Sequence, residues 1–306
     1  MAALPGSYDA ASPSALSHVT TTSAERTQAA APTLRDGYFE PDALQAIAAR
    51  VRSDYRSARP FPHVVIDEFL PADQLAAIVD ELSAAGEIAH TQRFDNAEER
   101  KLATDDESRL PPAARHLLTQ FNSAVFIEFL ESLTGIEGLV PDPHFVGGGF
   151  HEIKRGGFLK IHADFNKHRR LRLDRRINLL LYLNRDWREE YGGHLELWST
   201  DMKTREQRIL PVFNRCVIFN TTDFSYHGHP EPLMAPEGVS RRSLALYYYT
   251  NGRPEEEVSD DHGTLFQARP GEPPRARARI LLRRLLPPIV LDILRNARAR
   301  SSKRGS

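Results

Sequence analysis

The stretch FLKIHADFN, residues 158–166, places His162 and Asp164 two positions apart. The surrounding residues alternate as in a β-strand, and a strand directs every second side chain to the same face. An imidazole and a carboxylate on one face can both reach a single metal ion. The same pair is also expected on the solvent-facing side of a surface strand, so it indicates a metal site only if further ligands lie elsewhere in the chain.

A third candidate ligand lies well downstream, in FNTTDFSYHGHPEPL, after a separate predicted strand. Two imidazoles and one carboxylate occupy one face of an octahedron and leave three positions open, which is the arrangement of non-haem Fe(II) oxygenases. His227 and His229 share a face if this segment is extended. His229 precedes a proline, where the chain tends to turn away, so we favour His227.

Two further strands carry groups that would bind an anion. SRRSLALYYYT, residues 240–250, puts Arg241 and Ser243 on one strand face, and INLLLYLN puts Tyr182 on a strand between the two metal-binding segments. An Arg, a Ser and a Tyr that converge inside a barrel are costly to bury unless an anion satisfies them. The sequence therefore predicts an anion site near the metal.

The elements that position these residues fall into two regions. Before residue 136 we expect helices over 41–58, 71–86 and 111–135, a buried strand over 61–70 and a polar loop over 87–110. After about residue 140, short strand-like runs follow one another without helices between them. This pattern favours an antiparallel sandwich or barrel with the helices packed on one face. The runs are 144–154, 158–164, 176–184, 193–199, 207–210, 214–220 and 241–250.

The composition, with 41% hydrophobic and 26% charged residues in a length of 306, is typical of a globular protein that buries a hydrophobic core. The net charge of −1 gives no reason to expect a specific nucleic-acid partner. A single cysteine, Cys216, excludes a disulfide within the chain and fits a reducing compartment. With no signal-peptide pattern and no long apolar run, we expect a cytoplasmic protein.

The two ends of the chain differ from its middle. Residues 1–33 are rich in Ala, Ser, Thr and Pro, and we expect them to be disordered. Residues 34–255 form the predicted catalytic domain, with its β core at about 140–250, and 256–306 form a basic tail with short helices. Residues 275–306 alone carry ten Lys or Arg and one Asp, a local charge of +9. The tail either docks on the body as a helix pair or contacts an anionic membrane or acidic partner.

Taken in order, these motifs resemble the iron(II)- and 2-oxoglutarate-dependent dioxygenases, in particular their prolyl-4-hydroxylase-like branch. The matching text spans roughly 60–250: FPHVVIDEFLP, GGFLKIHADFN, RRINLLLYLNRDWREEYGGHLELW, CVIFNTTDFSYHGHPEP and RRSLALYYYT. The resemblance implies a double-stranded β-helix, or jelly roll, in a mainly β fold. It also implies that His162, Asp164 and His227 bind iron.

For the cosubstrate, the resemblance implies that Arg241 and Ser243 hold the distal carboxylate of 2-oxoglutarate and that Tyr182 donates to the same group. The implied reaction consumes O2, releases succinate and CO2 and hydroxylates a C–H bond, with ascorbate expected as a reductant. Related halogenases have a small residue at the position of Asp164, so the carboxylate favours hydroxylation.

Several alternatives stay open at this point. A metal-independent jelly-roll binding module and a cupin-like metal enzyme are the competing classes. The substrate is a small molecule, a peptidyl residue or a carrier-bound group, and the oligomeric state is unknown. The basic loop 165–176 either is solvated or clamps an acidic substrate.

Several polar residues and the single cysteine lie close to these motifs and can also be interpreted from the sequence. We interpret His194 and Glu196, a second H-x-E pair, as lying on an outward face, and Cys216 as a core residue. Asn178 and Asn220 flank the expected pocket as supporting donors, and His151 either lines or caps it.

Overall fold

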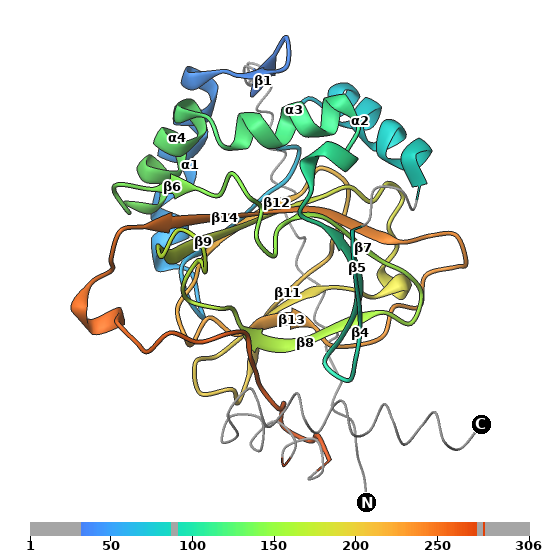
Figure 1. Cartoon of the computed structure of the whole chain (residues 1–306), viewed down its shortest axis with the longest axis vertical. Helices are drawn as coiled ribbons and strands as arrows, with labels where there is room; N and C mark the ends of the chain where they lie inside the picture. Colours follow the sequence, from blue (N-terminus) through green and yellow to red (C-terminus); the bar gives the residue numbers. More distant parts are fainter. Residues whose placement is uncertain (1–31, 87–90, 274–277, 279–306) are drawn as a thin grey trace, which may run out of the picture. The chain divides into compact units, whose positions relative to one another are not determined.

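The computed structural model of the chain describes residues 32–86, 91–273 and 278. Four α-helices lie in its N-terminal half (Figure 1): α1 (Pro41–Ser57), α2 (Ala72–Ala85), α3 (Pro112–Phe121) and α4 (Ala124–Thr134). Short 3₁₀ helices lie at Glu107–Arg109, Glu189–Tyr191 and Glu255–Glu257.

The strands are numbered along the chain. They are β1 (Leu34–Arg35), β2 (Tyr38–Phe39), β3 (His63–Ile66), β4 (Gln92–Asp95), β5 (Glu99–Thr104), β6 (Val140–Pro141), β7 (Gly149–Ile153), β8 (Phe158–Ala163), β9 (Asp174–Tyr182), β10 (Leu195–Trp198), β11 (Arg205–Ile209), β12 (Cys216–Asn220), β13 (His227–His229), β14 (Arg241–Thr250) and β15 (Leu265–Phe266).

The helices begin and end at residues suited to those positions. Pro41 opens α1, where a fixed φ and a missing N–H cost nothing. The Ser123 side chain caps α4 by accepting a hydrogen bond from the backbone N–H of Phe126, and Gly135 ends that helix in the left-handed conformation. These signals are readable in the sequence, which is why the three predicted helical segments are confirmed.

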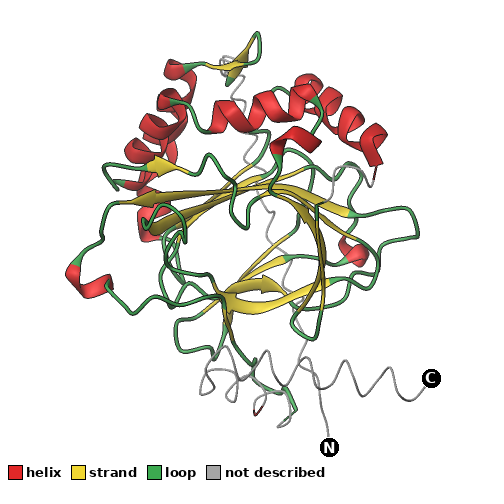
Figure 2. Ribbon diagram, in the orientation of Figure 1, coloured by secondary structure: helices red, strands yellow, loops and turns green. Residues whose placement is uncertain are grey.

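Thirteen strands of the described residues form one antiparallel sheet that curls on itself (Figure 2). One layer contains β7, β14, β9, β12 and β3 as successive neighbours, and a second layer contains β8, β13, β10 and β11. Strand β5 pairs with both β7 and β8 and so joins the two layers. This is the predicted double-stranded β-helix, in a mainly β fold with N-terminal helices on one face.

Strand β14 shows how the sheet separates the core from the site. Leu244, Leu246 and Tyr248 belong to the same buried apolar cluster as the helices, which cover this layer in Figure 1. The alternate residues Arg241 and Ser243 line a cavity on the opposite face. Because strand side chains alternate, one ten-residue strand serves the helical core and the polar site at the same time.

Several short strands lie outside the runs predicted from the sequence, among them β4, β5 and β15. The segment 87–110 was predicted as a loop, but β4 and β5 pair as a hairpin and the latter joins the main sheet. Five of the six β5 residues, ERKLAT, are polar or small, so the apolar alternation that indicates a strand is missing. Strand β15 similarly pairs with β8 beside His162 and Ala163.

Some expectations fall outside what the structure describes. The proposed disorder of the first residues and the helical pieces of the basic tail fall outside the described residues, so these domain boundaries stay predictions. Among the described helices, none combines the length and the apolar character needed to cross a membrane.

Candidate metal centre

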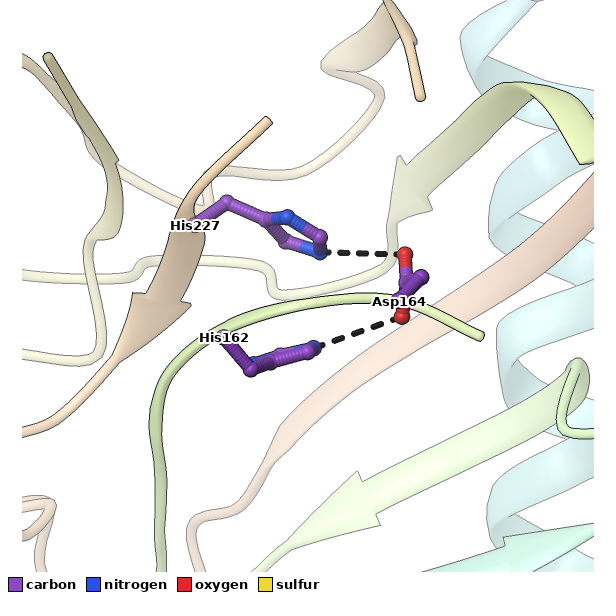
Figure 3. A group of neighbouring side chains, drawn as sticks. All are labelled: His162, Asp164 and His227. Carbon is purple, nitrogen blue, oxygen red and sulfur yellow. Dashed lines mark ion pairs between the residues drawn. The ribbon is translucent and has the colours of Figure 1, made fainter. Parts of the chain in front are cut away.

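Three candidate ligands come together where β8 and β13 run side by side. His162 lies on β8, Asp164 follows the last residue of that strand, and His227 opens β13 directly opposite His162 in the register. The Nε2 atoms of His162 and His227 each lie 3.4 Å from a carboxylate oxygen of Asp164 (Figure 3). Ligand atoms of all three residues lie within 4.8 Å of one another.

The backbone fixes which nitrogen of each imidazole faces this site. Nδ1 of His162 lies 2.8 Å from the carbonyl oxygen of Lys160, and Nδ1 of His227 lies 2.9 Å from that of Ser225. A carbonyl oxygen only accepts, so each Nδ1 must donate its proton. In the neutral rings, both Nε2 lone pairs then face the carboxylate, and a metal cation between them would relieve the repulsion.

Electrostatics favours an ionised Asp164 carboxylate and a neutral His227 ring. Burial alone would raise the pKa of Asp164, but the charge of Arg175 and its contacts with His227 and His162 hold that pKa well below its usual range. Burial lowers the pKa of His227 to about 4. At neutral pH the site therefore presents a carboxylate and a neutral imidazole, which are the forms that bind a metal ion.

Asp164 is also held in place by two neighbours. Asn178 donates to its Oδ2 at 2.6 Å, and Nη2 of Arg175 lies 3.0 Å from the same oxygen. Nε and Nη2 of Arg175 both donate to the side-chain oxygen of Asn178, and its guanidinium lies 3.4 Å from the ring centre of Tyr247. The ligand carboxylate is thus oriented before any metal arrives.

The ligands open onto a cavity of about 180 Å³ inside the curled sheet. On β14 and β9, Tyr247 pairs with Asn178 near Asp164, while Ser243 pairs with Tyr182 four positions further along. Arg241, Ser243, His151, His229 and Lys101 all line this cavity. One end of the cavity is therefore the metal site, and the other is rich in hydrogen-bond donors and positive charge.

Arg241 is anchored at this distal end. Its Nε donates to the carbonyl oxygen of Gly193 at 2.8 Å, and its Nη2 donates to the hydroxyl of Tyr182 at 3.2 Å. A Cβ at Gly193 would lie 2.9 Å from the Arg241 side chain, and φ there is +69°, so glycine is required. The arginine and the tyrosine are fully enclosed, and they form one rigid unit.

Two distal histidines stay neutral in this positive environment. Burial, followed by the charges of Lys101 and Arg241, lowers the pKa of His151 to about 3. Burial and the same two charges hold the pKa of His229 well below its ordinary value. Neither ring nitrogen of His229 has a hydrogen-bond partner in the described structure, although only 3% of the residue is exposed. An unpaired buried polar group of this kind costs about 1–3 kcal/mol.

The second H-x-E pair lies away from the cavity. Leu195 lines the cavity, so alternation along β10 directs His194 and Glu196 to the other face. There His194 contacts Glu189 at 3.0 Å and Glu196 accepts a hydrogen bond from Arg205 at 2.8 Å. Both residues are nevertheless buried, because other segments cover this face.

The basic loop 165–176 is largely committed to contacts within the protein. His168 and Asp142 form a fully buried pair at 3.2 Å. Arg172 pairs with Asp261 at the surface, and Arg175 is the buried partner of Asp164 described above. The loop is therefore not freely solvated, and the substrate clamp stays a prediction.

Sequence reasoning missed three cavity residues. Arg175 lies in the basic run, Lys101 lies in the segment expected to be a loop, and His229 was considered only as a rival metal ligand. Of the proposed supporting residues, Asn178 does contact Asp164, whereas Asn220 accepts a hydrogen bond from Tyr55 instead. Cys216 is completely buried in the core.

The region that contains this site matches a known protein family. Residues 148–249, which include all three candidate ligands and the Arg241 strand, match the family described as the 2OG-Fe(II) oxygenase superfamily. Residues 148–249 thus carry a domain of this superfamily. The oxygenase retains the H-x-D and distal histidine that such enzymes use to hold iron, so the sequence-based assignment of the family is confirmed.

Individual relatives are distant. The oxygenase is 25% identical over 195 residues to prolyl 3-hydroxylase OGFOD1 of Mus musculus, a match that covers 62% of this chain and 33% of the mouse protein. The chain thus spans about a third of the curated relative's length.

Two solved structures match the chain at low sequence identity. One is a prolyl hydroxylase from Trichoplax adhaerens in complex with a hypoxia inducible factor peptide fragment, with 18% identity, a TM-score of 0.50 and coverage of 68% of this chain and 91% of that one. The other is a prolyl-4-hydroxylase from Pseudomonas putida, with 18% identity, a TM-score of 0.46 and coverage of 68% and 100%.

Proposed function

We propose that this oxygenase binds Fe(II) through His162, Asp164 and His227 and hydroxylates a C–H bond while it converts 2-oxoglutarate to succinate and CO2. One observation carries the proposal. Three lone-pair donors converge at one end of an enclosed cavity whose other end is lined by an arginine and further hydrogen-bond donors. A ligand that chelates a metal through one end and carries an anion at the other fits this arrangement.

The donor set fits Fe(II). Two imidazoles and one carboxylate form the facial set typical of non-haem iron oxygenases, and the fixed Nδ1–H groups keep both Nε2 atoms available. When bound, the iron would supply the activation of O2. Arg175 and Asn178 would keep the Asp164 carboxylate in place throughout the reaction.

The opposite end of the cavity would hold the distal carboxylate of 2-oxoglutarate. A guanidinium binds a carboxylate through paired N–H groups, and Ser243 adds a hydroxyl donor on the same strand face. Tyr182 would assist by donating its hydroxyl proton, since burial raises the pKa of that phenol and keeps it protonated. Ascorbate as a reductant is part of the same proposal.

For the substrate, we propose a prolyl-hydroxylase-like acceptor. Support comes from the mouse relative, which is named a prolyl 3-hydroxylase, and from the Trichoplax neighbour, whose structure contains a peptide. A peptidyl substrate is therefore placed first, ahead of a free amino acid or a carrier-bound group. A cytoplasmic location is proposed with it.

The test is a turnover assay with purified protein, Fe(II) and 2-oxoglutarate. Succinate release is followed alone and with prolyl peptides, free amino acids and carrier-bound amino acids, and products are examined for the gain of one oxygen atom. We expect a prolyl peptide to raise succinate release above the substrate-free rate and to gain one oxygen.

The outcomes separate the parts of the proposal. No iron binding and no succinate release would leave a binding module. Metal-dependent turnover without O2 consumption would indicate a cupin-like enzyme. Stimulation by small molecules, and not by peptides, would overturn the proposed substrate class while retaining the oxygenase reaction.

A further inference from the structure

His229 is a buried side chain that the site described so far does not use. It lies two residues after His227 on β13, and its ring lines the same cavity. Among the described residues, neither Nδ1 nor Nε2 meets a hydrogen-bond partner, although 97% of the residue is covered. Buried polar groups are almost always paired, so this ring is suited to a partner that enters the cavity.

The neighbours of His229 define the charge of that partner. Arg241 from β14, Lys101 from β5, and His151 and His162 from β7 and β8 line the same cavity as His229. The carboxylates that line the cavity are already engaged: Asp164 at the metal site, and Glu99 at 3.3 Å from the Lys101 amine. The His229 imidazole carries at least one N–H group, which can donate to a negatively charged ligand in this environment.

His229 is not a better metal ligand than its neighbour. The register places His227 opposite His162, whereas His229 lies opposite Leu159, with an irregularity between the two. The group of residues whose ligand atoms converge contains His227 and omits His229. Its position follows the strand away from the metal, toward the end of the cavity where Arg241 is anchored.

We infer that His229 is a further cosubstrate-binding residue, whose ring N–H donates to the distal carboxylate of 2-oxoglutarate alongside Arg241 and Ser243. The inference rests on the proposed function, because that function supplies the dicarboxylate. It adds a fourth donor residue, after Arg241, Ser243 and Tyr182, and gives the pocket a stronger preference for a 2-oxo dicarboxylate over a 2-oxo monocarboxylate.

The experiment uses the full chain loaded with Fe(II) in the absence of O2. Dissociation constants are measured for 2-oxoglutarate and for 2-oxopentanoate, which has a methyl group in place of the distal carboxylate. The variants are His229→Phe, which keeps a ring without a donor, and His229→Asn, which keeps a donor. His194→Phe is the matched control, because it removes a buried imidazole from the face of β10 that is turned away from the cavity.

We expect His229→Phe to weaken 2-oxoglutarate binding about 10-fold or more, the effect of losing a hydrogen bond to a charged group. Binding of 2-oxopentanoate should change much less, so the preference for the dicarboxylate falls by a similar factor. His229→Asn should recover part of the affinity. In turnover, KM for 2-oxoglutarate should rise more than kcat falls, a split that a general loss of stability would not produce.

Each contrary result has a distinct meaning. If the wild-type protein binds neither Fe(II) nor 2-oxoglutarate, the proposed function fails. If it binds both, and both His229 variants keep wild-type affinity and selectivity, the inference is overturned. Loss of Fe(II) itself in a folded His229→Asn protein would instead make His229 a metal ligand and would also overturn it.

Discussion

The two ends of the central cavity differ in which of their polar atoms already have partners within the protein. At the metal end, the atoms that do not face the ion are already paired: each imidazole Nδ1 with a backbone carbonyl, and Oδ2 of Asp164 with Asn178 and Arg175. At the distal end, Arg241 has fixed partners, but His229 has none among the described residues. The three ligands of the metal end lack only a cation, and the distal end retains an unpaired donor for an anion.

This difference indicates which substitutions should abolish turnover and which should only weaken cosubstrate binding. A preorganised ligand set loses its geometry when one member is removed, because its neighbours are rigid and cannot replace it. Several donors that share one carboxylate can compensate in part for one another. Substitutions at the metal end should therefore remove turnover, and substitutions at the distal end should change affinity and selectivity.

The largest effect is expected at Asp164. Asp164→Ala removes the only carboxylate ligand and leaves Arg175 buried without its partner, so we expect succinate release to fall more than about 100-fold, beyond the range seen when a supporting residue is lost. His227→Ala should behave alike. Bound iron and succinate release are measured together, with thermal unfolding as a check on folding. Retention of most succinate release in either variant would falsify the assignment of the metal ligands.

A smaller effect is expected when the support of Asp164 is removed. Arg175→Met leaves the carboxylate in place with its Asn178 hydrogen bond but without its ion-pair partner, so we expect Fe(II) affinity to fall about 10–100-fold. The free energy of unfolding should also fall by about 3–5 kcal/mol, because a buried ion pair has lost one partner. Metal titration and denaturant unfolding measure the two quantities.

Arg172→Met provides the matched control for this prediction. It removes the same side chain from the same basic loop, but Arg172 pairs with Asp261 on the surface, where such a pair contributes about 0–1 kcal/mol. Equal losses of iron affinity in the two variants would mean that the loop acts through its general charge and not through Asp164.

Arg175 also shows where sequence reading reaches its limit. The H-x-D pair and the R-x-S motif stand on strands with clear apolar patterns, and the distal histidine follows a further apolar run at 214–220. Their order along the chain was therefore sufficient to predict the fold and the candidate ligands. Arg175 stands in a run of basic residues that has the composition of a solvated loop. Only the three-dimensional path of the chain buries it against Asp164.

The β4–β5 hairpin was missed for a related reason. Its inward side chains include Glu99 and Lys101, which face a polar cavity and not an apolar core. A strand that borders a polar site has no hydrophobic period to reveal it. The residues that complete a site are thus the ones that sequence patterns identify least well.

A moderate effect is expected on the pH dependence of stability. His151 has a pKa of about 3 in the folded protein, against 6.5 for an unperturbed imidazole. Between these values the unfolded chain binds one more proton, so stability present above pH 6.5 is lost as the pH falls. His151→Asn should reduce the slope of this loss by about 1.4 kcal/mol per pH unit.

Denaturant unfolding of the metal-free protein at pH 4.5 and 5.5 measures this slope. Other buried histidines also contribute to the slope of the unfolding free energy against pH. The difference in this slope between wild type and His151→Asn therefore reports on His151. Parallel stability curves would show that His151 titrates equally in the folded and unfolded states, and the distal end would then be less positive than its neighbours suggest.

The smallest effect is expected at His194, which has the same residue type and similar burial but faces the other way. Its ring contacts Glu189, whose side chain is largely exposed, so His194→Asn should cost no more than about 1 kcal/mol of stability. Iron and 2-oxoglutarate affinities should stay within about twofold of wild type. If iron binding were instead lost in this variant and kept in His162→Ala, the metal would lie on the opposite face of β10, and the contrast between the two cavity ends would have to be abandoned. All four histidines are buried and are of the same residue type. Unchanged iron and 2-oxoglutarate affinities in His194→Asn would therefore show that the cavity-facing position of His162, His227 and His229 determines their role.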